Sequence, residues 1–360
     1  MKLTEYMNDS VVHIFRNAIR SSQFNVKELY FLNQAVKIQK TAAKKRLQSD
    51  LSGTSVPPFL IASIATKCNL HCMGCYARAN RTCMDERSTN EMSSERWGEI
   101  FREARTLGVS FVLLAGGEPL ERADVLDEAA KTPELIFPVF TNGTLFTPAM
   151  LEQFDRCRNL IPVISLEGNR QQTDCRRGNG VFETIRQTMG DMTHLGMLFG
   201  VSITVTKENQ DTVTNPSFLS SLREIGCRLI FLVEYVPADG NMKPALDEKS
   251  RAVLEARQND LKAQYQDMII LSFPGDEKKM GGCLAAGRGF FHINAFGDAE
   301  PCPFSPYSDI SLKNSSLREA LDSTLFSKIR EKHFDAQEHV GGCVLFPRKA
   351  EIESLLTRRN

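Results

Sequence analysis

Three of the ten cysteines stand close together, at Cys68, Cys72 and Cys75, in the spacing CxxxCxxC. Three thiolates in one loop suit an iron-sulfur cluster. A structural zinc site normally has four protein ligands, whereas three thiolates on a 4Fe-4S cluster leave one iron open to bind another molecule. The alternatives are a zinc site that takes His71 as its fourth ligand, and free buried thiols.

The cysteines follow an apolar run that predicts a strand, and from Pro58 onward such runs alternate with amphipathic helical stretches. This alternation is typical of parallel strands joined by helices. The clearest helix start is Thr147-Pro148, where a capping hydroxyl precedes a proline suited to the first turn. The predicted strands are Phe59 to Ala65, Phe111 to Ala115, Ile136 to Thr141, Ile161 to Leu166, Phe199 to Thr206 and Leu229 to Val236.

Six βα units are too few for a complete eight-stranded barrel, yet polar residues and glycines gather where each strand ends, as they do at the catalytic face of a barrel. We therefore expect an α/β fold built on a partial (β/α)6 TIM-like barrel. The predicted domains are a helical N-terminal extension (1–57), the barrel core (58–240), a connecting helix and strand (241–275) and a small C-terminal iron-sulfur domain (276–360). In the extension, helical periodicity covers Val11 to Ile19 and Leu29 to Val36.

The CxxxCxxC spacing after the first strand of a barrel resembles the radical S-adenosylmethionine (SAM) superfamily, and the resemblance extends over about Phe59 to Val236. It implies that Cys68, Cys72 and Cys75 hold a 4Fe-4S cluster whose open iron is chelated by SAM. It also implies reductive cleavage of SAM to a 5′-deoxyadenosyl radical, which abstracts a substrate hydrogen. Many members have an aromatic residue just before the third cysteine, where this chain has Gly74, so Tyr76 is the candidate to cover the adenine.

Further SAM contacts are expected at the ends of later strands. Gly116-Gly117-Glu118-Pro119 matches the family motif that binds the SAM amino group, with Gly117 and Glu118 as the expected contacts. By resemblance, Ser165 touches the ribose or carboxylate, and Arg177 pairs with the carboxylate, which a guanidinium fork suits. The other candidates are Asn142, Glu167 and Thr204. An ordinary loop or strand-end role stays open for the last two.

Near the C-terminus, Cys283 and Cys302 flank a predicted hairpin, and Cys343 follows a helix. The spacing resembles the start of a SPASM domain, shortened toward the reduced version called a twitch domain. The resemblance implies an auxiliary 4Fe-4S cluster on these three cysteines. Its fourth position is left either to a substrate atom or to a side chain such as Asp298, His339 or a remote cysteine. Unligated core thiols are the alternative.

Lys plus Arg and Asp plus Glu balance at 44 each, so charge indicates neither nucleic acid nor a membrane as a partner. The basic run from Lys37 to Arg46 is interpreted as a solvated helix face rather than an RNA site. No apolar run approaches the roughly 20 residues of a membrane span, and no signal-peptide core is present. We expect a cytoplasmic protein, a compartment in which cysteines more often bind metals than form disulfides.

Three functions fit these patterns. The first is a radical SAM enzyme that modifies a peptide or protein, with an electron donor such as flavodoxin or ferredoxin. The second is a radical dehydrogenase or rearrangement enzyme for a small molecule, because shortened cluster domains occur there too. The third, from another class, is an iron-sulfur electron carrier that never uses SAM. The sequence names no catalytic acid, base or hydrogen donor.

Overall fold

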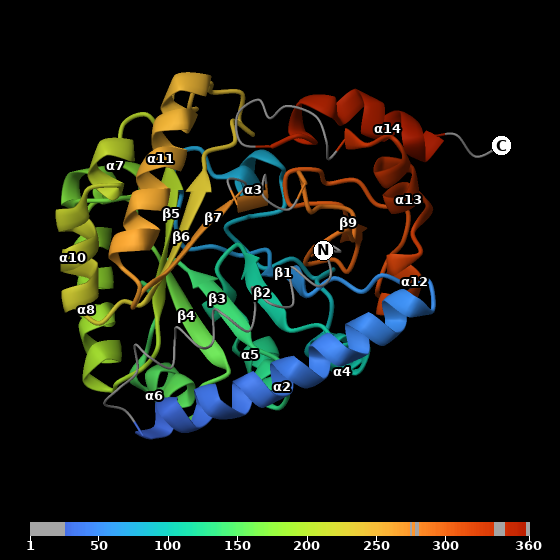
Figure 1. Cartoon of the computed structure of the whole chain (residues 1–360), viewed down its shortest axis with the longest axis horizontal. Helices are drawn as coiled ribbons and strands as arrows, with labels where there is room; N and C mark the ends of the chain where they lie inside the picture. The colour runs from blue at the N-terminus through green and yellow to red at the C-terminus, as the bar shows by residue number, and fades with distance from the viewer. Residues whose placement is uncertain (1–25, 274–275, 278–280, 335–342, 358–360) are drawn as a thin grey trace.

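The computed structural model describes residues 26–273, 276–277, 281–334 and 343–357, and its centre is a parallel sheet that curves into an open barrel (Figure 1). The strand order is β7-β6-β5-β4-β3-β2-β1-β8-β9, and only the last pair is antiparallel. The strands are β1 (Phe59–Ala65), β2 (Phe111–Gly116), β3 (Phe137–Thr141), β4 (Leu160–Ser165), β5 (Gly200–Val205), β6 (Leu229–Glu234), β7 (Ile269–Phe273), β8 (His292–Ile293) and β9 (Ala299–Glu300).

The six predicted strands are confirmed as β1 to β6, with bounds that differ by no more than two residues. The strand expected within the connection 241–275 is β7, and it pairs in parallel with β6 from Leu229 opposite Ile269 to Val233 opposite Phe273. It therefore adds a seventh parallel strand to the barrel.

Helices cover the outer face of the sheet (Figure 1). The predicted helix start at Thr147 is confirmed, because its hydroxyl accepts a 3.2 Å hydrogen bond from Met150 N and Pro148 occupies the first turn. The outer helices are α4 (Ser94–Leu107), α5 (Ala123–Ala130), α6 (Pro148–Arg156), α7 (Arg170–Arg177), α8 (Val181–His194), α9 (Gln210–Val213), α10 (Pro216–Glu224) and α11 (Glu248–Gln264).

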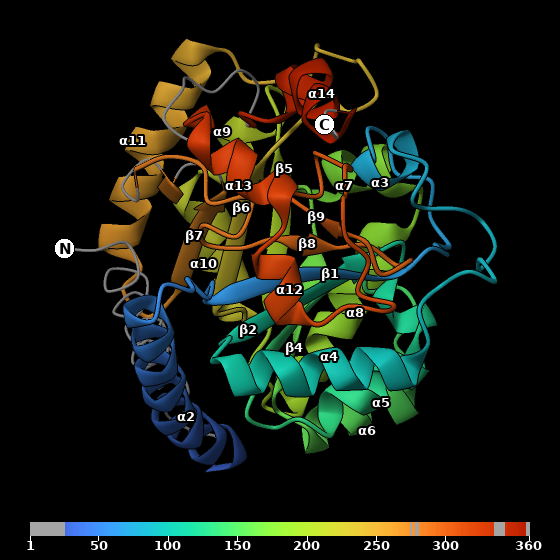
Figure 2. The same cartoon turned by 90° about the vertical axis from the view of Figure 1, so that its right-hand side faces the viewer.

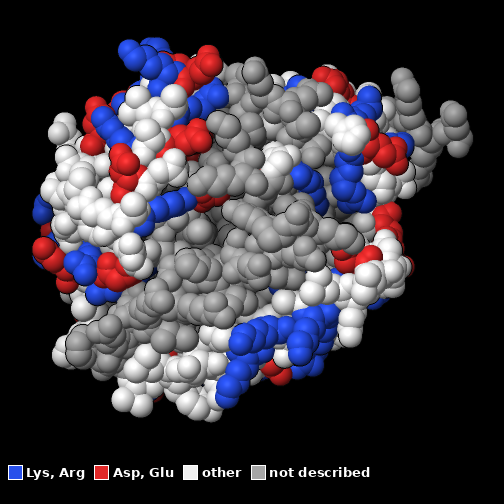
Figure 3. Space-filling model, in the orientation of Figure 1, with Lys and Arg blue, Asp and Glu red and all other residues white. Residues whose placement is uncertain are grey.

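The long helix α2 (Val26–Leu51) runs along the end of the barrel at which the strands begin (Figure 1). Its fully buried Leu32 and Ala35 pack in one apolar cluster with Ile136, Ile161, Leu198 and Leu229. The charged side of α2 is exposed at Lys37, Lys40 and Lys44, and Figure 3 shows basic side chains gathered there. The helical stretch predicted from Val11 to Ile19 lies outside the described residues.

The C-terminal segment joins the barrel through β8, which pairs in parallel with β1 (Figure 2). A hydrogen bond of 2.7 Å links Ser63 Oγ to His292 Nε2 across this junction, and Phe59 stacks on Phe290. The hairpin predicted here is formed by β8 and β9. The remaining helices are α12 (Leu317–Leu321), α13 (Thr324–Glu331), the 3-10 helix η4 (Phe346–Arg348) and α14 (Lys349–Thr357). No helix of the described ranges is both long and apolar enough to cross a bilayer.

Candidate active site

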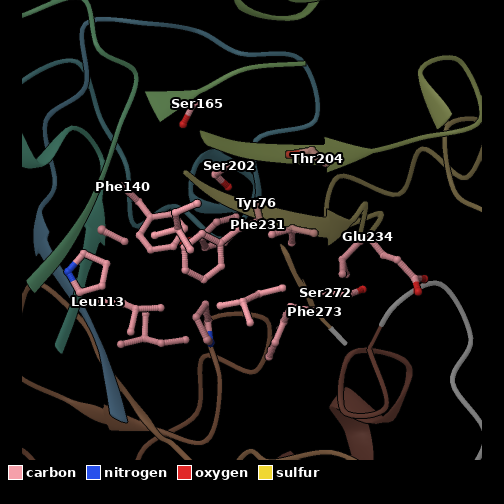
Figure 4. A pocket seen from close by; sticks show the side chains of 18 of the residues that line it. Tyr76, Leu113, Phe140, Ser165, Ser202, Thr204, Phe231, Glu234, Ser272 and Phe273 are labelled. Atoms are coloured by element: carbon pink, nitrogen blue, oxygen red, sulfur yellow. The ribbon is translucent and has the colours of Figure 1, made fainter. Parts of the chain in front are cut away.

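A cavity of about 1360 Å³ fills the barrel interior and reaches the loops that follow the strands. This exceeds the roughly 300–1,000 Å³ of a typical small-molecule site, so the cavity has room for two ligands side by side. Its wall is largely apolar, with hydroxyl and carboxyl groups at intervals (Figure 4). The apolar lining includes Ile61, Leu113, Phe140, Phe231 and Phe273, and the polar lining includes Ser165, Ser202, Thr204, Glu234 and Ser272.

The loop between β1 and the short helix α3 (Tyr76–Ala79) places all three cysteines of the CxxxCxxC pattern on the cavity wall. Cys68 N donates to Met84 O at 3.0 Å, which fixes the start of the loop. Leu70 N donates to Cys68 Sγ at 3.5 Å, and Arg177 Nη1 donates to Cys72 Sγ at 3.8 Å. Because such donors stabilise thiolates, the loop is suited to bind a cluster.

Cys83 is a further thiol beside this loop, buried and hydrogen-bonded to Cys68. That bond lowers the pKa of Cys68 to about 6, whereas burial raises the pKa of Cys72. In the described part of the chain, no three His, Cys, Asp or Glu side chains converge closely enough to hold a single metal ion. In a 4Fe-4S cluster each thiolate binds a different iron, so the sulfurs stand farther apart than the ligands of one ion.

Gly116 and Gly117 bring the end of β2 into direct contact with the cysteine loop. Gly117 N donates to Ala65 O, and Glu118 N donates to Lys67 O, both at 2.7 Å. A Cβ at Gly116 would lie 2.5 Å from Ala65 O, and one at Gly117 would lie 2.2 Å from Lys67 O. No other residue type fits this approach of two backbones.

The Glu118 side chain ties the ends of two strands together. Its carboxylate accepts from Thr141 Oγ1 at 2.6 Å, from Asn142 N at 2.8 Å and from Leu120 N at 3.1 Å. Burial raises its pKa to about 7 against these donors. Glu118 lines the cavity, while Pro119 begins the 3-10 helix η1 (Pro119–Glu121) behind it.

Asn142, Ser165 and Thr204 all line the same cavity from the ends of β3, β4 and β5. Asn142 Nδ2 donates to Asn69 Oδ1 at 2.8 Å and lies 4.0 Å from Cys68 Sγ, next to the cysteine loop. Figure 4 shows the hydroxyls of Ser165 and Thr204 at the cavity wall. The structure thus brings these three predicted side chains to one site.

The buried Glu167 forms an ion pair with the partly buried Arg177. Arg177 Nε donates to Glu167 Oε1 at 2.9 Å, and Arg176 Nη1 lies 2.8 Å from the same oxygen. Arg177 lines the cavity, whereas Glu167 is not one of the described residues that line it. The Arg177 guanidinium therefore reaches toward the cavity with its orientation set by Glu167, and its Nη1 also contacts Cys72.

Two tyrosines flank the cysteine loop in different ways. Tyr76 packs edge-on against Phe304, at 5.1 Å between ring centroids, and thereby connects the loop to the C-terminal segment. Tyr235, just after β6, lies against Gly74, where a Cβ would come within 2.7 Å of Tyr235 Cε2. The ring of Tyr235 thus occupies the space that a side chain at position 74 would fill. The spacing of the residues in the sequence did not indicate this contact.

Cys283, Cys302 and Cys343 are brought together in the C-terminal segment, all of them buried. Cys302 is hydrogen-bonded to Cys343, and both interact electrostatically with Cys283. The buried Glu277, which the sequence did not single out, acts on Cys283 and Cys343 and also lines the cavity. Burial raises the pKa of Glu277 to about 8. His339 lies outside the described residues.

The comparison with known proteins agrees with this geometry. The family description "Radical SAM superfamily" matches residues 62–215, which contain the cysteine loop and the ends of β1 to β5. The chain belongs to the radical SAM superfamily. PqqA peptide cyclase of Methylorubrum extorquens is 38% identical over 262 residues, 68% of this chain and 66% of that protein.

Other relatives cover more of the chain. AdoMet-dependent heme synthase of Methanosarcina barkeri is 25% identical over 319 residues, which is 81% of this chain and 88% of that one. Mycofactocin maturase MftC of Mycolicibacterium smegmatis is 25% identical over 323 residues, 81% and 79% of the two chains. Streptococcus suis SuiB bound to precursor peptide SuiA has the same fold, with a TM-score of 0.65, 18% identity and coverage of 83% and 72%.

Proposed function

We propose that this radical SAM enzyme modifies a peptide or protein, and that Cys68, Cys72 and Cys75 hold its catalytic 4Fe-4S cluster. When bound, the cluster supplies the electron that cleaves SAM to methionine and a 5′-deoxyadenosyl radical, which abstracts a substrate hydrogen. The observation that carries the proposal is the cysteine loop at one end of a 1360 Å³ cavity, which leaves room for a second molecule beside SAM.

We propose a different role in SAM binding for each group of residues around the loop. Gly116, Gly117 and Asn142 approach the loop by backbone or amide contact, which supports the proposal that they bind the methionine end. Arg177, held by Glu167, is the cation on the cavity wall for the SAM carboxylate. Ser165 and Thr204 offer hydroxyls for the ribose. Tyr76 and Tyr235 supply aromatic surface beside the loop.

A peptide substrate is supported by relatives whose names state peptide chemistry, PqqA peptide cyclase and mycofactocin maturase. The grouping of Cys283, Cys302 and Cys343 supports an auxiliary 4Fe-4S cluster in the C-terminal segment. We further propose flavodoxin or ferredoxin as the electron donor and the cytoplasm as the compartment, in line with cysteines kept reduced for metal binding.

Anaerobic reconstitution tests both cluster assignments. Wild-type protein is expected to bind about eight irons, and Cys302→Ala about four, because each cluster contains four irons. Under dithionite, wild-type protein should form 5′-deoxyadenosine and Cys72→Ala should form none, as measured by liquid chromatography. Deoxyadenosine production retained by Cys72→Ala would contradict the proposal.

The electron-carrier alternative predicts a different result. SAM added to the reduced protein should change the electron paramagnetic resonance spectrum of an enzyme whose open iron binds SAM. A spectrum unchanged by SAM would indicate a carrier. A synthetic peptide encoded next to the gene, incubated with enzyme, SAM and dithionite, should change mass if it is the substrate.

A further inference from the structure

Four charged side chains form a closed ring next to the start of the cysteine loop. Glu91 Oε2 accepts a hydrogen bond from Arg122 Nη1 at 3.0 Å and another from Arg87 Nε at 2.8 Å. Asp124 Oδ1 accepts from Arg122 Nε at 2.8 Å, and Asp124 Oδ2 lies 3.6 Å from Arg87 Nη2. The Glu91 and Arg122 side chains are only 2% and 1% exposed, whereas Arg87 and Asp124 reach solvent. We call these four residues the Glu91 network.

The carboxylate of Glu91 binds the base of the cysteine loop. Its Oε1 accepts from Thr66 N at 2.7 Å and from Thr66 Oγ1 at 2.6 Å. Thr66 is fully buried, directly follows β1 and stands two residues before Cys68. Its carbonyl accepts from Met84 N at 2.7 Å, and Met84 O accepts from Cys68 N at 3.0 Å. Glu91 therefore fixes the backbone that carries Cys68.

The guanidinium of Arg122 binds the segment that follows Gly116-Gly117-Glu118-Pro119. Arg122 ends the 3-10 helix η1, and its N–H donates to Pro119 O at 3.0 Å. Its Nη1 also donates to Ile64 O at 2.8 Å, and its Nη2 donates to Met92 O at 3.2 Å. One buried ion pair thus joins the residues after the glycine turn to the end of β1.

The energetics of a buried ion pair favour a role in positioning. Desolvation offsets most of the attraction, so such a pair adds little stability compared with apolar residues of the same size. A guanidinium and a carboxylate do, however, hold each other in a narrow range of geometries. None of the four residues is among the described residues that line the cavity, whereas Cys68, Gly117 and Glu118 do line it. The network can therefore act on a bound molecule only through the two segments that it joins.

We propose that the Glu91 network is a positioning network, which fixes the spacing between the cysteine loop and the glycine turn and thereby sets the affinity for SAM. The inference rests on the proposed function, in which Cys68 holds the cluster and Gly117 binds the methionine end of SAM. SAM bound in this way contacts both segments at once, so a change in their spacing costs affinity although no residue of the network touches SAM.

Thr66→Val and Thr66→Ser test the link to the cysteine loop. Valine has nearly the shape of threonine but lacks the hydroxyl that binds Glu91, whereas serine keeps it, and neither change leaves a buried charge unpaired. Equilibrium dialysis of reconstituted holoenzyme against SAM, without a reductant and normalised to bound iron, gives the dissociation constant. Thr66→Val should raise it about three- to tenfold, the factor of one hydrogen bond to a charged group. Thr66→Ser should stay within about twofold of wild type.

Two matched double variants separate positioning from stability. Glu91→Gln with Arg122→Gln removes the buried pair of the network. Glu28→Gln with Arg158→Gln removes another buried pair, at the opposite end of the barrel, in which the arginine also binds an aspartate. The first double variant should raise the dissociation constant for SAM at least about tenfold, as loss of contacts around a metal site does. The second should leave it within about twofold, and urea unfolding of the apoproteins compares the two losses of stability.

A dissociation constant within twofold of wild type for both Thr66→Val and the Glu91/Arg122 variant overturns the proposal. Equal weakening of SAM binding by the two double variants also overturns it, because the effect would then follow from lost stability. If the Glu91/Arg122 variant does not fold, the comparison of Thr66→Val with Thr66→Ser decides alone. Failure of the proposed function is distinguishable, since wild-type holoenzyme itself would then not bind SAM.

Discussion

Gly74 has a φ of +68°, and the ring of Tyr235 lies where its side chain would be. Two separate costs therefore oppose a side chain at this position, the left-handed backbone and the collision with Cε2 at 2.7 Å. The ring lies against the residue that precedes Cys75, and both Tyr235 and Cys75 line the cavity. This arrangement links a residue of the cysteine loop to the end of β6, far away in the sequence.

Gly74→Ala should lower the free energy of unfolding by about 2–3 kcal/mol, of which the positive φ accounts for about 1 kcal/mol. Gly53→Ala isolates the backbone cost, because Gly53 has a φ of +88° and nothing within 4 Å of a Cβ. In a Tyr235→Leu background the cost of Gly74→Ala should fall to that of Gly53→Ala. Urea unfolding of the apoprotein measures all four variants; equal costs in both backgrounds would contradict the packing argument.

Glu118 provides a prediction about pH. Its pKa is raised to about 7, so the native state holds a proton that the unfolded state, with an ordinary carboxyl, has lost. Stability from this group is therefore full below about pH 4.5 and declines as pH rises toward 7. Relative to Glu118→Gln, which stays neutral, wild-type apoprotein should lose about 1–3 kcal/mol between pH 5 and 8. Urea unfolding of both proteins across this range checks it; a constant difference would mean an unshifted carboxyl.

At the scale of elements, helix α6 begins where the sequence predicted, because Thr147 and Pro148 act through local geometry alone. Thr147→Ala removes the acceptor for Met150 N and should cost about 1 kcal/mol. Thr147→Ser keeps that acceptor and should cost much less. Thermal or urea unfolding distinguishes the two, and equal losses would show that the cap does not stabilise α6.

The same distinction between local and distant contacts explains what the sequence could predict. Strands β1 to β6 and the cysteine loop were predictable, because apolar runs and cysteine spacing are local patterns. The sequence did not predict that Cys83, Tyr235 and Glu277 lie beside the two cysteine groups. These contacts depend on how the chain folds, because none of the three residues belongs to the local cysteine patterns. Sequence periodicity shows that a residue has a buried face, but it does not show which element covers that face.

For the whole molecule, helix α2 illustrates the limit of that information. Periodicity predicted a helical extension, whereas the structure shows the helix packed against the starts of the barrel strands. Glu28 forms a buried ion pair with Arg158 at 2.9 Å, and Arg46 Nη1 donates to Ser110 Oγ at 2.7 Å. The helix therefore closes the end of the barrel opposite the cysteine loop and is part of the core.

Leu32 is the test of this closure, since it is fully buried in the cluster between α2 and the barrel. Leu32→Ala should lower the free energy of unfolding by about 2–5 kcal/mol through lost burial and the cavity it leaves. Leu51→Ala, on the same helix but 83% exposed, should change it by less than about 0.5 kcal/mol. Urea unfolding of apoprotein measures both. A small loss for Leu32→Ala would mean that α2 detaches from the barrel before the core unfolds, and the helix would then be an appendage rather than part of the core.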